Sequence, residues 1–250
     1  MFIFIIKDTM IKTNTEENKL KKKVIRLSLK EVSGKDGLMT GRKSNGIIYT
    51  VRKDRHKYFF PDEWNKFLNV IREDKIILFE TLLQTGGRID EVLHLKPRDF
   101  VWDNNSVTLR VTKSKATKGE SKVLGGKARS FSVSSQYLRK LRKHIRDYQI
   151  KDEDYLFPIT KQGVSQLFKR GLRKAELKEW EYSLHNIRKT SGMWLKTVQR
   201  RGSDLDVSEI CMRLGHDHNT FLKHYGSPSI FTDQQRDKIV EILGDMYKLR

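Results

Sequence analysis

Four side chains in the last third of the sequence have the chemistry to bind a phosphate group and attack it. They are His185, Arg188, His216 and Tyr225. An arginine presents a planar pair of donors that matches two phosphate oxygens, histidines carry protons near neutral pH, and a tyrosine hydroxyl is a nucleophile. The spacing of three between His185 and Arg188 places both on one face of a helix. The pattern predicts an anion site followed by a nucleophile.

A second arginine, Arg88, lies far upstream and follows the double glycine Gly86-Gly87. Glu91 comes three residues later and is within reach of Arg88 if the segment is helical. The apolar residues around Arg88 predict that its side chain is buried. An arginine that begins a helix and pairs with an acid of the first turn shows the same spacing, so this pattern alone leaves the role of Arg88 open.

The nine-residue offset between His216 and Tyr225 requires a break in the backbone. On one unbroken helix the two side chains would lie on opposite faces. Gly215 can end the first helix, and Asp217 or Asn219 can cap the next one. We therefore expect His216 in the turn and Tyr225 at the far end of a short second helix.

The start of a helix predicted over residues 184–199 favours an anion. Ser183 is expected to cap it, so His185 and Arg188 lie near its N-terminus, where free backbone N–H groups and the helix dipole attract negative charge. Taken singly, each piece also has an ordinary structural interpretation. These are a core histidine for His185 and a surface salt bridge for Arg188. His216 could equally have a capping or core role, and Tyr225 could be an ordinary half-buried tyrosine.

In their order, these pieces resemble the catalytic domain of the tyrosine recombinases, the phage-type integrases. The resemblance spans residues 80–226. It rests on Thr85–Leu93, a lysine-bearing hairpin, Leu184–Arg188, Leu214–His216 and His224–Gly226. One His-x-x-Arg occurs by chance in many helices, whereas five pieces in this order are specific.

The resemblance implies a role for each residue. The implied catalytic residues are Arg88, Lys115, His185, Arg188, His216 and Tyr225. The two arginines and His216 would stabilise the scissile phosphate of DNA, and Glu91 would orient Arg88. Tyr225 would attack to form a 3′-phosphotyrosyl link while His185 helps to move its proton. Because the bond energy stays in that link, no nucleotide, metal or other cofactor is implied.

A lysine of the hairpin would protonate the departing 5′-oxygen. Residues 106–111 and 128–133 alternate with period two and are expected to form antiparallel strands around a basic loop. Ser114-Lys115 and Gly126-Lys127 both fit the context that the family uses. We favour Lys115 because it follows the first strand closely, and Lys127 stays open as the alternative. The other lysines of the loop are expected only to contact backbone phosphates.

Three histidines, His216, His218 and His224, also raise the question of a metal. Their spacings of two and six residues, without a nearby cysteine or a second set of carboxylates, argue against zinc. No metal site is therefore expected.

The charge of the chain favours a nucleic-acid partner. The formal net charge is +20, which attracts the chain to polyanions. Residues 110–146 hold twelve Lys and Arg against one acid, and residues 1–57 hold fifteen against six. Basic runs are often only solvated surface, but two of them around a candidate site shift the balance to double-stranded DNA. The resemblance also implies that the chain assembles as a homotetramer on that DNA.

Periodicity predicts a mainly α fold with a small antiparallel β-sheet (α+β), the tyrosine recombinase catalytic-domain fold, over residues 58–250. With 37 % hydrophobic residues the chain can bury a core. A C-terminal helix over 232–250, capped by Thr232 and Gln235, is expected to dock on a neighbouring subunit. The other helices are expected from 61 and 88 onward and over 74–84, 134–148, 162–176, 184–199, 205–214 and 218–225.

Residues 1–57 are expected to form a basic arm or a reduced core-binding region, with short strands near 24–29 and 46–51. The family has a longer helical DNA clamp at this place, so the clamp is reduced, supplied by another chain, or lost from a remnant. Residues 1–6 are apolar but too few to span a membrane, and we expect a strand or an upstream start there. The single Cys211 is expected in the core. Together with the resemblance, this leads us to expect a cytoplasmic, nucleoid-associated protein of prokaryotic or viral origin.

Two other functions stay open beside a site-specific recombinase. A type IB topoisomerase uses the same kinds of side chain without a tetramer or a specific site. An inactive DNA-binding remnant would fit the short N-terminal region, although the nucleophile and both arginines are present. The Gly-His before the tyrosine and the single compact domain favour the recombinase. The target site, and the choice among integration, excision and dimer resolution, stay open.

Overall fold

The computed structural model divides the chain into two compact units, Met1–His56 and Lys57–Arg250. It describes the residues 38–42, 48–52, 58–110, 128–179, 181–200, 205–225 and 231–246, without the side chains of 38–52, 200 and 223–225. In the first unit, β1 (Leu38–Arg42) and β2 (Ile48–Arg52) form an antiparallel hairpin. The predicted strand near 46–51 corresponds to β2, whereas β1 was not predicted. The segments 1–6 and 24–29 lie outside the described residues.

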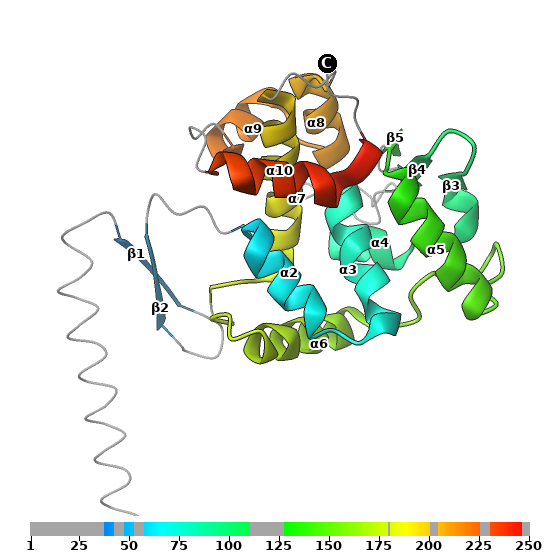
Figure 1. The fold of residues 1–250 in the computed structure, drawn as a ribbon, viewed down its shortest axis with the longest axis horizontal. Helices are drawn as coiled ribbons and strands as arrows, with labels where there is room; N and C mark the ends of the chain where they lie inside the picture. Colours follow the sequence, from blue (N-terminus) through cyan, green and yellow to red (C-terminus); the bar gives the residue numbers. More distant parts are fainter. Residues whose placement is uncertain are drawn as a thin grey trace, which may run out of the picture. The chain divides into compact units, whose positions relative to one another are not determined.

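The second unit is mostly helical with a small antiparallel sheet, which confirms the predicted fold class (Figure 1). Each helix predicted between residues 61 and 225 is present. The helices and 3-10 turns are α2 (Pro61–Asn69), α3 (Glu73–Thr85), α4 (Ile89–Leu93), η1 (Pro97–Asp99), α5 (Ser135–Asp147), α6 (Lys161–Lys174), α7 (Leu184–Arg200), α8 (Val207–Leu214), α9 (His218–Tyr225), α10 (Asp233–Leu243) and η2 (Gly244–Met246). The central helix α7 packs against α3, α8, α9 and α10. None of the helices described is long and apolar enough to cross a bilayer.

The sheet has the strand order β3-β4-β5, with β3 (Phe100–Val101), β4 (Ser106–Leu109) and β5 (Arg129–Ser132). Both predicted strands are present and pair antiparallel, with Val107 opposite Phe131. Strand β3 was not predicted, because two residues are too few to show a period. The alternation along β4 and β5 buries Val107, Leu109 and Phe131 on one face.

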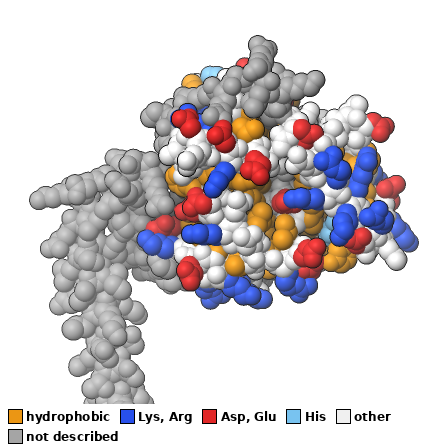
Figure 2. All heavy atoms as spheres, viewed as in Figure 1, with side chains coloured by type: hydrophobic (Ala, Val, Ile, Leu, Met, Phe, Trp, Pro, Cys, Tyr) orange, Lys and Arg blue, Asp and Glu red, His pale blue; other side chains and the backbone are white. Residues whose placement is uncertain are grey.

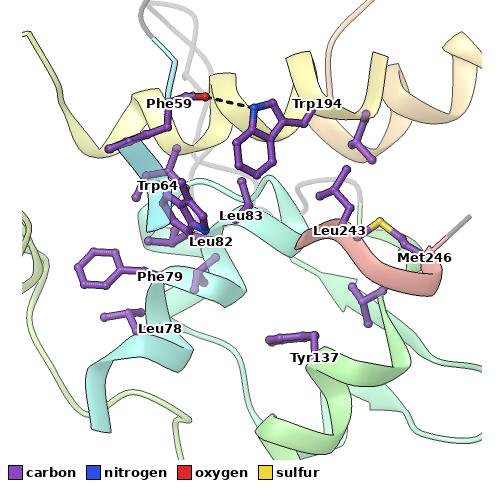
Figure 3. Close-up of a cluster of buried hydrophobic side chains, with 14 of the residues drawn as sticks. Phe59, Trp64, Leu78, Phe79, Leu82, Leu83, Tyr137, Trp194, Leu243 and Met246 are labelled. Atoms are coloured by element: carbon purple, nitrogen blue, oxygen red, sulfur yellow. Dashed lines mark hydrogen bonds between the residues drawn. The ribbon is translucent and has the colours of Figure 1, made fainter. Parts of the chain in front are cut away.

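Six buried aromatic side chains form the centre of the core between α2, α3, α6 and α7, and we call them the aromatic cluster. They are Phe59, Trp64, Phe67, Phe79, Phe168 and Trp194. Trp194 Nε1 donates to the carbonyl oxygen of Phe59 at 3.1 Å, drawn as a dashed line in Figure 3. The backbone N–H of Phe59 donates to Thr190 Oγ1 at 2.8 Å. Two hydrogen bonds therefore fix α7 to the segment before α2.

The C-terminal segment packs on its own chain. Helix α10 begins with the predicted capping box of Thr232 and Gln235, and its residues Ile239 and Leu243 are buried. The helix predicted over 232–250 ends at Leu243, because Gly244 takes a positive φ of 68°. After it, Asp245 accepts hydrogen bonds from Ser134 and Ser135 at the start of α5. Residues 231–246 are thus held within one chain, and the predicted docking on a neighbour stays a prediction.

Candidate active site

The loop between α3 and α4 brings the first sequence piece to the site. Gly86 ends α3 in the left-handed conformation, at φ 59°. A Cβ at this position would lie 2.9 Å from Leu214 Cδ2, so the close approach of α8 also requires glycine. The carbonyl oxygen of Gly86 accepts a hydrogen bond from Arg188 Nη1 at 2.8 Å. The predicted break at Gly86-Gly87 thus places a backbone acceptor beside a predicted site residue.

Arg188 joins three parts of the chain. Its side chain is buried, with 2 % of its surface exposed, which excludes a surface salt bridge. Besides Gly86, Nη2 donates to the carbonyl oxygen of Leu214 and lies 3.2 Å from His216 Nε2. Carbonyl groups hold a guanidinium in place without neutralising its charge. Two of the predicted site residues, 28 positions apart, are therefore in contact.

The predicted break between His216 and Tyr225 is present. Helix α8 ends at Gly215 in the left-handed conformation, at φ 56°. Asp217 caps α9 by accepting from Thr220 N at 2.8 Å and from Thr220 Oγ1 at 2.7 Å. His216 lies in the turn, and Tyr225 is the last residue of α9. The side chain of Tyr225 lies outside the described atoms, so its role stays a prediction.

The start of α7 carries His185 one turn before Arg188. Asn186 Oδ1 accepts from Ser183 N at 2.8 Å and from Ser183 Oγ at 2.5 Å. Ser183 therefore directly precedes the first helical residue, as predicted for a capping residue, and the side chain of the third helical residue accepts its backbone N–H. His185 is exposed and not a core histidine. It is accessible to a ligand from solvent.

Arg88 is the residue directly before α4, and it pairs with Glu91, as its spacing predicted. Glu91 Oε2 accepts from the backbone N–H of Arg88 at 2.8 Å, and Oε1 accepts from Arg88 Nη1 at 2.9 Å. The prediction that Arg88 is buried was wrong, since 49 % of its side chain is exposed. Arg88 precedes the helix instead of lying on its apolar face, and Val92 takes the buried place.

A third arginine, Arg129, was not predicted to belong to this site. It is buried at the start of β5, and both of its terminal nitrogens bond to Glu91, Nη1 to Oε1 at 3.2 Å and Nη2 to Oε2. Burial by itself would raise the pKa of Glu91, but the hydrogen bonds from Arg129 and Arg88 outweigh it and hold that pKa below its usual range. Arg129 and Phe131 are two residues apart in β5 and lie on the same buried face of the strand. This alternation was the signal in the sequence that could have predicted the burial of Arg129.

A fourth arginine, Arg213, is fully buried in α8. It donates to the carbonyl oxygens of Gln84, at 2.9 Å, and Ser132, and it lies over the ring of Phe131 with 4.4 Å between Cζ and the ring centroid. We call Arg88, Glu91, Arg129, Arg188 and Arg213 the arginine cluster. Four of its five members are arginines, and half-exposed Arg88 is the one that an anion can reach most readily from solvent.

The candidate lysines, Lys115 and Lys127, lie outside the described residues, as does the loop over 111–127 that carries them. The two ends of this loop are described. Strand β4 ends at Leu109, and Arg129 begins β5. The choice between the two lysines stays open.

In the described part of the basic segment, Arg110 and residues 128–146, several basic side chains pair with acids. Arg129 is buried with Glu91, and acids from outside or at the edge of the segment pair with further residues, as Glu80 does with Lys140 at 2.5 Å and Asp147 with Lys143 at 3.1 Å. Figure 2 shows Lys and Arg side chains gathered over α5, with acidic side chains among them. The exposed basic residues of α5 are Arg139, Lys140, Arg142, Lys143 and Arg146.

Within the described part of the chain, no three His, Cys, Asp or Glu residues gather as a metal site. Cys211 is buried, as predicted.

Comparison with protein families finds a match over most of the second unit. The model described as "Phage integrase family" matches residues 57–229, which is more than half of the chain. No curated protein matches the sequence.

Several solved structures have a similar fold. One is the XerA recombinase, with 17 % sequence identity and a TM-score of 0.51, covering 74 % of this chain and 64 % of that one. Another is the XerH site-specific recombinase bound to its difH substrate before cleavage, with 20 % identity, a TM-score of 0.52, and coverage of 81 % and 59 %. A third is the Tn1549 transposon integrase in complex with circular intermediate DNA, with 18 % identity, a TM-score of 0.53, and coverage of 72 % and 64 %. This chain therefore spans 59–64 % of the length of those chains.

Proposed function

This chain belongs to the phage integrase family, and from that premise we propose that it is a site-specific DNA recombinase that cleaves and rejoins strands through a 3′-phosphotyrosyl intermediate. One observation carries the proposal. Arg188 bonds to Gly86 and Leu214 and contacts His216, so pieces that are far apart in the sequence meet around one buried guanidinium. Half-exposed Arg88 and exposed His185 give the same region groups that a phosphate can reach from solvent.

In the proposed reaction, Tyr225 Oη bonds to the phosphorus of the scissile phosphate and the bond from phosphorus to the 5′-oxygen breaks. His185 helps to remove the tyrosine proton, and Lys115 gives a proton to the departing 5′-oxygen. Arg88, Arg188 and His216 stabilise the charge of the pentacoordinate phosphorus. Attack by a 5′-hydroxyl then reverses these steps and releases Tyr225. The phosphotyrosyl link conserves the bond energy, so the reaction needs neither a nucleotide nor a metal.

Double-stranded DNA is the proposed partner, in a homotetramer in which four protomers exchange strands between two duplexes. The net charge of +20 and the exposed basic residues of α5 support a DNA partner. The solved XerH and Tn1549 proteins were bound to DNA, which supports the same partner by analogy. Action on DNA in the cytoplasm of a prokaryotic or virus-infected cell belongs to the same proposal.

A covalent trap tests the proposal. The full chain is mixed with nicked duplexes of randomised sequence in the presence of EDTA, and denaturant-resistant protein–DNA complexes are isolated. Mass spectrometry is expected to map the link to Tyr225, and sequencing of the trapped strands is expected to return one preferred site. Trapping without a preferred site, together with plasmid relaxation, would instead favour a topoisomerase. Tight DNA binding without any covalent complex would contradict the proposal and favour an inactive DNA-binding protein.

A further inference from the structure

We propose that Arg129 is a positioning residue for strand cleavage, which holds Arg88 through Glu91 and holds the turn that carries His216 through the backbone of α8. This inference rests on the proposed function and adds to it a residue that never touches the substrate. It starts from the burial of Arg129 and Glu91, whose side chains are only 6 % and 1 % exposed.

Glu91 stands between the two arginines. Arg129 bonds to both oxygens of the carboxylate, and Arg88 bonds to the same two oxygens through its backbone N–H and its Nη1. A guanidinium that binds both oxygens fixes the plane of a carboxylate as well as its position. The direction in which Glu91 accepts from Arg88 is therefore set from behind by Arg129. This keeps the half-exposed guanidinium of Arg88 at the rim, where a phosphate would bind.

The third donor of Arg129 reaches the other side of the site. Nε donates to the carbonyl oxygen of Arg213 at 2.8 Å. The next residue, Leu214, gives the carbonyl that accepts from Arg188, and a Cβ on Gly215 would lie 3.5 Å from Arg129 Nη1. One side chain thus ties β5 to the start of α4 and to the end of α8. Because Arg129 follows Lys127 by two residues, it also anchors the lysine-bearing hairpin.

The charge of Glu91 depends on the same contact. Burial favours the neutral acid, and the bonds from Arg129 and Arg88 keep the pKa of Glu91 below its usual range. Among the elements that pack on α4, Lys161 of α6 bonds to Asp90 at 2.7 Å and not to Glu91. Without Arg129, burial would act against Arg88 alone, and the pKa of Glu91 would rise. Glu91 would then become protonated as the pH falls through that raised pKa, and its hold on Arg88 would weaken.

The experiment measures single-turnover formation of the covalent complex by the full chain, on the duplex selected by the trap, from about pH 5 to pH 8. Arg129→Gln is expected to cleave more slowly than the wild type, and the deficit should grow by up to about tenfold per pH unit below the raised pKa of Glu91. DNA affinity should be unchanged. The ratio of the two rates at each pH removes what the two proteins share, and the double variant described below tests whether Glu91 is the group that titrates.

Three further variants separate positioning, stability and the titration of Glu91. Arg129→Lys keeps the charge but loses the fork, so it should retain the wild-type pH profile at a lower rate throughout. Arg213→Met also removes a buried arginine, one that bonds to the carbonyl oxygens of Gln84 and Ser132, and it should lower the melting temperature without changing the shape of the profile. The double variant Glu91→Gln with Arg129→Gln removes the titrating group, so its profile should also have the wild-type shape.

The outcomes distinguish this inference from the proposed function. No covalent complex with the wild type would overturn the proposed function. A wild-type complex together with an unchanged profile for folded Arg129→Gln would overturn the role of Arg129 alone. If Arg129→Gln does not fold, Arg129→Lys decides, because a wild-type rate for that variant would show that the fork is not needed.

Discussion

The aromatic cluster is buried throughout, and the arginine cluster is buried except for half-exposed Arg88. Both contact α3 and α7, yet they contribute different things. Phe79 and Trp194 of the first pack against other rings and gain free energy by leaving water. Arg188 and Arg213 of the second lose their hydrogen bonds to water when they are buried. Hydrogen bonds to backbone carbonyl groups in fixed places replace them. The first cluster tolerates small shifts, whereas the second requires a particular backbone geometry.

This difference separates stability from chemistry. We expect substitutions in the aromatic cluster to lower the free energy of unfolding and to leave the reaction of each folded molecule unchanged. Substitutions at reacting groups should do the reverse. Residues that link the arginine cluster to the backbone should affect both, and the size of each effect tests the comparison.

Tyr225→Phe should have the largest effect on chemistry and almost none on stability. The variant lacks the hydroxyl that attacks phosphorus, so it should form no covalent complex, while its DNA affinity and melting temperature stay those of the wild type. Denaturing gels measure the covalent complex, and binding isotherms measure the DNA affinity. A covalent complex that survives the substitution would remove Tyr225 from the mechanism.

Lys115→Ala should slow cleavage by about 10²- to 10⁴-fold, the usual contribution of a general acid. A substrate with sulfur in place of the 5′-bridging oxygen has a leaving group that needs no proton, so it should restore the rate. The matched control is Lys127→Ala. If the sulfur substrate restores the rate of Lys127→Ala and not that of Lys115→Ala, Lys127 is the general acid. If it restores neither rate, both lysines only contact backbone phosphates.

Phe79→Ala tests the other cluster. Removing a fully buried aromatic side chain should lower the free energy of unfolding by about 3–5 kcal/mol. Chemical denaturation measures that loss, and cleavage per folded molecule at low temperature should equal that of the wild type. Phe79→Leu, which keeps most of the volume, should recover most of the stability. A cleavage defect in molecules shown to be folded would mean that the two clusters are coupled through α3.

Local patterns were sufficient to predict most of the fold. Apolar spacing located the helices, and the break between His216 and Tyr225 followed from Gly215 and Asp217, because helix ends depend on residues close in sequence. The alternation of β4 and β5 was visible for the same reason. Strand β3 and the hairpin strand β1 were missed, since neither shows a period of its own.

Partners far apart in sequence could not be read in the same way. Arg129 and Glu91 are 38 residues apart, and a count of charges along the chain placed Arg129 on a basic surface when it lies in a buried ion pair. The exposure of Arg88 was missed because Arg88 precedes the helix, and Glu91 and Val92 occupy its buried positions. Arg188 and His216 are in contact, whereas the catalytic roles of all the predicted site residues stay predictions.

Gly86→Ala should have the smallest effect and should test the link between backbone and arginine cluster. Alanine at φ 59° is strained, and its Cβ would lie 2.9 Å from Leu214 Cδ2, so we expect a loss of about 1–3 kcal/mol in the free energy of unfolding. Movement of the Gly86 carbonyl away from Arg188 should also slow cleavage. Gly244→Ala is the matched control, because Gly244 has a φ of 68° and a Cβ there would lie 2.5 Å from Ser134 Oγ, outside the arginine cluster. Both variants should lose stability and only Gly86→Ala should cleave more slowly when folded, since only its carbonyl holds Arg188. Equal cleavage by both would mean that Arg188 keeps its position without Gly86.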